Sequence, residues 1–133
     1  MKVVLPCLLA TTLLAACAAG PAYDSPYALV EPGTQSAARR ETPVFIHDVD
    51  GQIPVAQRYG IPIQPGKHVV IVHYSHGAVE GAPEKHVRRI DLEAAPCMRY
   101  RIVARHTALV HVEWEPVVYS EPIGECSQRF PRS

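Results

Sequence analysis

The chain has 133 residues, and its 13 Lys and Arg residues balance its 13 Asp and Glu residues, so the formal net charge at pH 7 is zero. A neutral chain gives no electrostatic reason to bind nucleic acid, and we expect no nucleic-acid partner. The length suits one small domain.

The N-terminus has the layout of an export signal. Met1 and Lys2 are followed by an uncharged apolar run of about fourteen residues, short of the roughly 20 that a membrane-spanning helix needs. A charged start followed by a short apolar stretch is typical of a secretory signal peptide. We therefore predict that residues 1–16 are a signal peptide that is removed on export.

The end of the apolar run carries a more specific motif. Leu14-Ala15-Ala16-Cys17 resembles the lipobox of bacterial lipoproteins, in which small residues precede the cysteine whose thiol accepts a diacylglyceryl group. The resemblance implies cleavage before Cys17, acylation of the new amino group by a fatty acid such as palmitate, and firm attachment to a membrane. Ala18 follows instead of an aspartate. The enteric sorting rule then implies the outer membrane, with the domain facing the periplasm.

Residues 17–42 show no apolar period. Small and polar residues dominate, and proline and glycine pairs such as Gly20-Pro21 and Pro32-Gly33 interrupt the segment. Such a composition buries too little apolar surface to offset the entropy of ordering the chain. The sequence predicts a lipidated start followed by a disordered tether.

The next segments have the patterns of strands. Residues 44–49 precede Asp50-Gly51, which suits a tight type I′ turn because both positions tolerate positive φ, and residues 52–55 are expected to return from it. Residues 60–64 are a short extended piece whose proline suits an edge strand or an irregular strand. Residues 67–74 are rich in β-branched side chains and predict a longer strand.

The C-terminal half alternates between apolar and polar residues. Predicted strands cover residues 88–94, 98–105, 109–115 and 117–119. About seven short strands, 13 prolines and no helical period favour an all-β fold, a small antiparallel β-sandwich. We expect this domain at residues 43–126, with a C-terminal tail at 127–133.

Two cysteines remain once the signal peptide and the lipidated residue are set aside. Cys97 and Cys126 would stand in an oxidising compartment, where disulfides persist, so a disulfide between them is the natural expectation. Closing a loop of about thirty residues stabilises a fold by roughly 3–4 kcal/mol. The alternative is metal binding by the two thiols, which have no close Cys or His partner in the sequence.

The stretch from Val49 to Val72 resembles PEGA-like domains, small β-sandwiches on the outside of bacterial cells. The resemblance lies in Val49-Asp50-Gly51, Ile61-Pro62-Ile63 and Pro65-Gly66-Lys67-His68, followed by the run from Val69. The literal Pro-Glu-Gly-Ala motif is missing. The resemblance implies an accessory role at the cell envelope and supplies no catalytic residue.

Seven histidines raise the hypothesis of a metal site. His73, His76 and His86 are the candidate ligands, although no zinc-binding His motif is present. His68 lies in the Pro-Gly-Lys-His turn, where we expect it to bond the local backbone. Without a metal-binding motif, the leading expectation is that no cofactor is bound.

Enzymatic and sugar-binding chemistry has weaker signals. Ser75 beside His76 lacks a nucleophile elbow. Glu113 and Glu115 could act together as a glycosidase pair, but they are better interpreted as a solvated strand face. If their strand neighbours that of Arg99 and Arg101, we expect these opposite charges to face each other. Trp114, Tyr100 and Tyr119 are candidates for an aromatic platform, but the alternation places Trp114 in the core.

The sequence therefore predicts a non-enzymatic cell-envelope lipoprotein that acts as a structural or binding module. Its expected partners are the membrane, through the lipid anchor, and an unidentified envelope protein or peptidoglycan. The alternatives are a periplasmic metal-binding protein that uses the histidines and a carbohydrate- or peptidoglycan-binding module.

Overall fold

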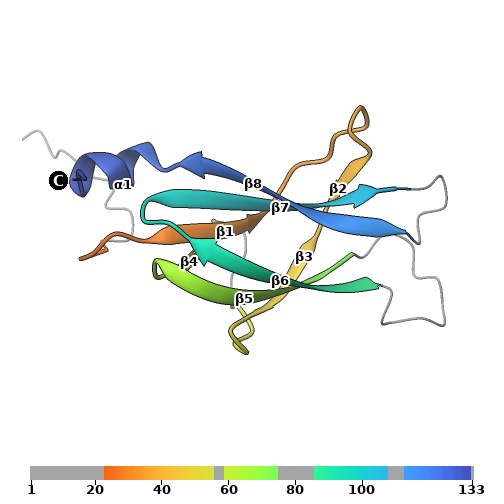
Figure 1. Cartoon of the computed structure of the whole chain (residues 1–133), viewed down its shortest axis with the longest axis horizontal. Helices are drawn as coiled ribbons and strands as arrows, with labels where there is room; N and C mark the ends of the chain where they lie inside the picture. The colour runs from red at the N-terminus through yellow and green to blue at the C-terminus, as the bar shows by residue number, and fades with distance from the viewer. Residues whose placement is uncertain (1–22, 56–58, 75–85, 108–112, 133) are drawn as a thin grey trace, which may run out of the picture.

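The computed structural model describes residues 23–55, 59–74, 86–107 and 113–132. Within these ranges the chain forms eight strands in two sheets and one short helix (Figure 1). The predicted all-β sandwich is confirmed, with eight strands in place of about seven. The predicted signal peptide and lipobox, with Cys17, lie outside the described residues.

The larger sheet is built around β7 (Met98–His106). Along one edge, β7 pairs with β8 (Trp114–Pro122) over its whole length. Along the other edge, β1 (Ala28–Pro32) and β2 (Glu41–Pro43) follow one another, and β4 (Ile61–Ile63) adds to the far side of β1. The β1–β7 pair is parallel, which departs from the predicted antiparallel pairing.

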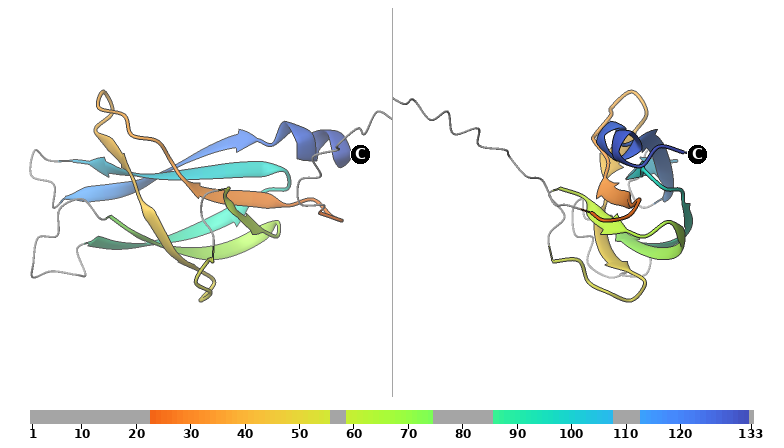
Figure 2. Two further views of the ribbon diagram at one scale, coloured as in Figure 1. Left: turned by 180° about the vertical axis from the view of Figure 1, so that it is seen from behind. Right: turned by 90° about the vertical axis from the view of Figure 1, so that its left-hand side faces the viewer.

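The smaller sheet has the order β3-β5-β6. Its strands are β3 (Phe45–Val49), β5 (Gly66–His73) and β6 (Val87–Ala94), and both pairs are antiparallel. The two sheets lie face to face, as the end-on view in Figure 2 shows. Apolar side chains at alternate strand positions fill the space between them, because successive residues of a strand point to opposite faces. Those without any exposed surface are Ala28, Val30, Ile46, Val70, Val72, Ile102 and Ala104.

The prediction of a disordered tether over residues 17–42 is wrong for a large part of that segment. Ala28 and Val30 are fully buried in β1, in the middle of the larger sheet, and β2 begins at Glu41. The apolar run in β1 is only three residues long, so it has no recognisable period. Its stability comes from pairing with β7, about seventy residues further along the chain, which local propensity does not report.

Two boundaries at the C-terminus also differ from the prediction. The expected tail at 127–133 is wrong for residues 127–129, which complete the helix α1 (Gly124–Arg129). The expected strands at 109–115 and 117–119 are replaced by the single strand β8, while residues 108–112 lie outside the described residues. Pro116 did not interrupt β8 because an edge strand needs no donor on its outer side.

The predicted Asp-Gly turn is confirmed. Asp50 and Gly51 have φ angles of 53° and 79°, and Val49 and Gln52 exchange both backbone hydrogen bonds at 3.0 Å. These values match a type I′ turn. The expected return strand at 52–55 does not form beyond Gln52; Ile53 in this segment is 70% exposed.

Candidate functional site

The predicted disulfide is present. The Sγ atoms of Cys97 and Cys126 are 2.04 Å apart, and the two cysteines are separated by 29 residues. Both are buried. The bond joins the turn between β6 and β7 to the helix α1, so it fixes the helix to the body of the sandwich.

A second, smaller core surrounds this disulfide. Leu29 and Ile123 are buried with the two cysteines, and Tyr27 packs against them. The backbone N–H of Cys97 donates to the carbonyl of Tyr27 at 2.7 Å, and the N–H of Ile123 donates to the carbonyl of Cys97 at 2.8 Å. Residues 23–27, the turn at 95–97 and α1 are therefore fastened together; we call this part of the molecule the α1 end.

A groove of about 720 Å³ opens at the α1 end. Its apolar lining includes Met98 and Phe130 together with four prolines, and Arg129 and Arg132 are its charged residues. Phe130 is half-buried, while both arginines are exposed. The groove therefore combines an apolar wall with a positively charged rim.

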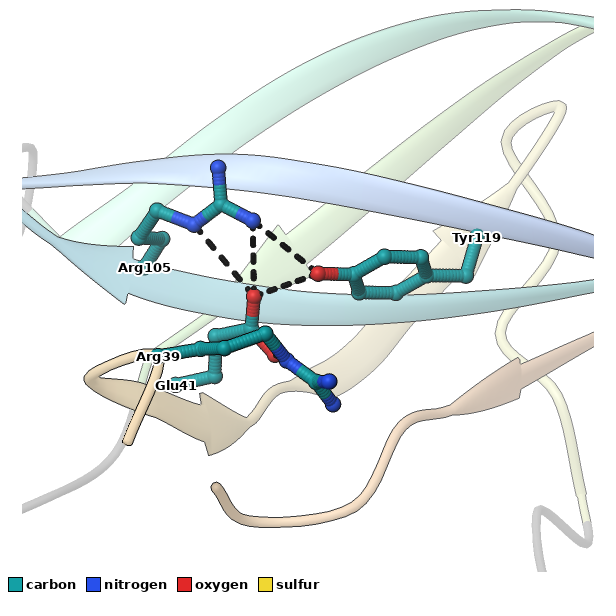
Figure 3. A network of polar contacts seen from close by, with 4 residues as sticks. All are labelled: Arg39, Glu41, Arg105 and Tyr119. Carbon is teal, nitrogen blue, oxygen red and sulfur yellow. Dashed lines mark hydrogen bonds and ion pairs between the residues drawn. The ribbon is translucent and has the colours of Figure 1, made fainter. Parts of the chain in front are cut away.

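A buried carboxylate lies on the outer face of the larger sheet, some distance along β7 from the α1 end (Figure 3). The side chain of Glu41 has no exposed surface. Its Oε1 accepts hydrogen bonds from the Tyr119 hydroxyl at 2.5 Å and from Arg105 Nη2 at 2.8 Å, and its Oε2 accepts one from Arg39 Nε at 2.8 Å. The carboxylate of Glu41, on β2, is thus bound by side chains from β7, from β8 and from the loop before β2.

Burial, the largest single influence, raises the pKa of Glu41, but the hydrogen bonds from Tyr119, Arg105 and Arg39 together lower it to about 2. Glu41 is therefore ionised at neutral pH and fully neutralised by two guanidinium groups. A carboxylate occupied by three donors has little capacity left to act as a general base. The arrangement fits a structural role, in which these contacts hold β2 against β7 and β8. The sequence analysis missed it, because Arg105 and Tyr119 are 64 and 78 residues away from Glu41.

Beside the contacts of Glu41, β1, β7 and β8 carry a row of ion pairs on the same outer face. Arg101 contacts Glu31 at 2.7 Å and Glu121 at 3.0 Å, and Arg99 contacts the same two carboxylates. The prediction that Glu113 and Glu115 oppose Arg99 and Arg101 is wrong. The register of β7 and β8 places Glu121 opposite Arg99, and Glu115 falls opposite Arg105 instead.

His68 forms a hydrogen bond with the local backbone, as predicted, and it also contacts the carboxylate of Asp50. Its Nε2 lies 2.6 Å from the carbonyl oxygen of Gln64, and its Nδ1 lies 2.6 Å from Asp50 Oδ2. A carbonyl and an ionised carboxylate only accept hydrogen bonds, so both contacts are hydrogen bonds at the same time only when the His68 ring is protonated. Burial lowers the pKa of His68, but the hydrogen bonds with Asp50 and Gln64 outweigh it and raise the pKa above its usual value. The pair joins the Asp-Gly turn to the start of β5.

The proposed metal ligands are only partly described. His73 lies at the end of β5, where burial and the nearby charges of His47 and His86 lower its pKa. The ring of His47 stacks on that of His73 with 4.5 Å between centroids. His76 lies outside the described residues. Within the described ranges, no group of three or more His, Cys, Asp or Glu side chains is arranged to hold a metal ion. The sequence analysis did not select His47, because its contact with His73 arises only from the pairing of β3 with β5.

The aromatic platform is not formed by the predicted residues. Trp114 is 4% exposed and lies in the main core, where Arg88 packs over its ring at 4.8 Å from the centroid. Tyr100 is also buried, and its hydroxyl accepts a hydrogen bond from the N–H of Ala95. Tyr119 is more exposed but is engaged with Glu41. The prediction that Trp114 belongs to the core is confirmed.

No known protein family, curated protein or solved structure matches this chain. The resemblances to bacterial lipoproteins and to PEGA-like domains therefore rest on the quoted motifs and remain predictions. Among the described residues, no helix has the length and apolar character needed to cross a bilayer.

Proposed function

We propose that the protein is a non-enzymatic lipoprotein of the bacterial cell envelope, held on the membrane by acylation of Cys17, with a β-sandwich that serves as a structural or binding module. The proposed location is the outer membrane, on its periplasmic side. The PEGA-like resemblance belongs to the same proposal, because it implies an accessory role at the cell envelope.

The observation that carries this proposal is the disulfide between Cys97 and Cys126. A disulfide in the interior of a small domain indicates folding in an oxidising compartment, which for a bacterial chain lies beyond the cytoplasmic membrane. The lipobox at Leu14–Cys17 supplies the route of export and the site of attachment. The two features are independent, since the disulfide lies 80 residues or more beyond the lipobox.

The non-enzymatic part of the proposal rests on the polar groups of the folded domain. Glu41 and His68 are engaged on all sides by neighbouring groups, as structural side chains are. In the described part of this outer face, Arg99 and Arg101 are paired with Glu31 and Glu121, and a small pocket of about 130 Å³ is lined by Thr34, Glu41 and Tyr119 among others. Such a face suits contact with another macromolecule, and an envelope protein or peptidoglycan is the partner we propose.

Acylation is tested by growing cells with a radiolabelled fatty acid and comparing variants at two cysteines. Cys17→Ala is expected to abolish the label and to leave an uncleaved precursor, whereas Cys7→Ala, a change in the discarded signal, is expected to keep both label and cleavage. Equal labelling of the native protein and Cys17→Ala, or absence of label from the native protein, would contradict the proposal.

A second candidate function, periplasmic metal binding, is favoured by the histidines at one end of the smaller sheet. His47 stacks on His73, and imidazole suits zinc and copper, but within the described residues no third ligand is arranged with them to hold a metal ion. Titration of Zn²⁺ and Cu²⁺ into the mature protein tests this function. Submicromolar binding that His73→Gln abolishes would support it, and binding weaker than micromolar would remove it.

A further inference from the structure

The chain between the proposed anchor and the folded domain is short. The described residues begin at Tyr23, and the carbonyl of Tyr27 is already bonded to the body of the domain through Cys97. Five residues lie between Cys17 and Tyr23. The six Cα–Cα steps from Cys17 to Tyr23 span at most roughly 21 Å when the chain is extended. An acylated Cys17 therefore keeps the domain within that distance of the membrane, much closer than a tether that reaches residue 42 would require.

The α1 end is the part of the domain that this short segment brings near the membrane. Tyr27, the disulfide and α1 contribute to the second core, and Figure 1 and the left-hand view of Figure 2 show the start of β1 and α1 at the same end of the molecule. Glu113, just before β8, lies at the opposite end. The nine residues of β8 separate the two ends by roughly 30 Å.

The groove at the α1 end is lined by apolar and cationic side chains, while two exposed carboxylates of this end, Asp24 and Glu125, are not among its lining residues. The charged residues that line its groove are Arg129 and Arg132, and no carboxylate is among the lining residues in the described part of the chain. Phe130 and Pro131 stand between the two arginines in the sequence. Arginine attracts lipid phosphates, and an aromatic ring beside it suits the headgroup layer.

We propose that the α1 end docks on the surface of the membrane that holds the anchor, with Arg129 and Arg132 against the phosphates of anionic phospholipids and Phe130 and Pro131 in the headgroup layer. This proposal rests on the proposed acylation of Cys17, which supplies proximity. Electrostatic attraction to a lipid surface acts over about 10 Å at moderate salt. The arginines are therefore attracted to the lipid only when the short connection brings them close to it. Docking would orient β8 away from the membrane and present the far end of the sandwich to a partner.

The orientation is tested with the acylated protein purified from membranes and reconstituted into vesicles whose lipids are brominated near the top of the acyl chains. Bromine quenches an indole only at close range. Pro131→Trp places an indole at the proposed contact, and Glu113→Trp places one at the opposite end. The native protein provides the baseline, since its Trp114 is buried. We expect vesicles of phosphatidylglycerol and phosphatidylcholine to quench the indole of Pro131→Trp by roughly half or more, as a headgroup-level side chain requires. The indole of Glu113→Trp should remain unquenched.

The role of the charges is tested in the Pro131→Trp protein by adding Arg129→Glu and Arg132→Glu. The reversal is expected to remove most of the quenching, as is replacement of phosphatidylglycerol by neutral lipid, whereas the matched reversal Arg89→Glu on β6 should leave it intact. Quenching that changes neither with the reversal of the two arginines nor with the lipid composition would mean proximity without docking and would overturn the inference.

Absence of quenching in all vesicles, which is the outcome expected if the groove serves a protein partner, would also overturn the inference. Mass spectrometry of the same sample separates the two proposals. An acylated protein without quenching contradicts the docking alone, whereas a protein without acyl groups contradicts the proposed function.

Discussion

At the scale of single residues, two charged side chains hold distant segments together. Glu41 is ionised inside the protein because three donors surround it, and its contacts fix β2 to β7 and β8. His68 and Asp50 form a similar contact at the surface, which joins the Asp-Gly turn to β5. Each of these contacts makes stability depend on pH in a direction that follows from its pKa shift.

Glu41→Gln is expected to lower the free energy of unfolding by about 3 kcal/mol at pH 7, because it leaves two guanidinium groups around a neutral amide. The native pKa of about 2 lies below the ordinary value of 4.5, so this stabilisation is complete above pH 4.5 and is lost as pH falls towards 2. Urea unfolding of the native protein and the variant between pH 7 and pH 2.5 measures the difference.

Glu115→Gln is the matched control for this experiment, because Glu115 is exposed and lies opposite the same arginine, Arg105. It should cost less than about 0.5 kcal/mol at any pH. A difference between native protein and Glu41→Gln that does not shrink with acid would contradict the role assigned to the carboxylate.

The pair of His68 and Asp50 is expected to stabilise the fold in the opposite pH range. The pKa of His68 is raised, so the contribution of its imidazolium is complete below pH 6.5 and disappears as pH rises through the native pKa. A double-mutant cycle with His68→Gln and Asp50→Asn should show a coupling energy of about 1 kcal/mol or less at pH 5.5, since Asp50 is partly exposed. The coupling should be weaker at pH 9 than at pH 5.5; equal coupling at both pH values would refute the assignment.

The residue scale also shows which side chains a sequence identifies. Asp50 and Gly51 form a local turn, and a dipeptide with two positive φ values is recognisable from its composition. The role of His68 was predicted in part, because Gln64 is four residues away, whereas its bond to Asp50 joins residues 18 positions apart. Glu41 carries no local sign of burial.

At the scale of elements, β1 decides where the domain begins. It lies between β7 and β4 in the larger sheet, and Ala28 and Val30 are fully buried there. Strands with sustained alternation, such as β6 and β7, were predicted nearly to the residue. A five-residue strand that ends in proline and pairs in parallel has no such alternation, and only the assembled sheet accounts for it.

Truncation tests the position of this boundary. A chain that starts at Tyr23 is expected to fold, whereas a chain that starts at Pro43 loses β1 and β2 and should be unfolded, because the edges of β7 and β4 and the core behind them are exposed. Circular dichroism and proton NMR dispersion of the two proteins provide the comparison. Equivalent folded spectra would show that β1 is dispensable.

The disulfide is the second element-scale feature, because it fastens α1 to the turn before β7. The double variant Cys97→Ala/Cys126→Ala is expected to lose roughly 3–4 kcal/mol, since the closed loop of 29 residues is released in the unfolded state. Urea unfolding with and without reductant measures the loss: reductant should weaken the native protein and leave the variant unchanged. A variant as stable as the oxidised native protein would contradict this role.

At the scale of the whole molecule, the two ends of the sandwich have different surroundings in the proposed account. The α1 end carries the disulfide and the arginine-rimmed groove, and the opposite end carries the last residues of β5 and β7 and the first residues of β8. We propose that a short connection to an acylated Cys17 directs the α1 end to the lipid and leaves the other end free for a partner.

The central claim is that the mature protein begins at an acylated Cys17. Intact-mass and N-terminal peptide analysis of the native protein extracted from the membrane fraction tests it most directly. The account predicts a chain that lacks residues 1–16 and whose first residue carries a diacylglyceryl group and an amide-linked fatty acid. A chain recovered from the cytosol with Met1 in place and an unmodified thiol at Cys17 would contradict it.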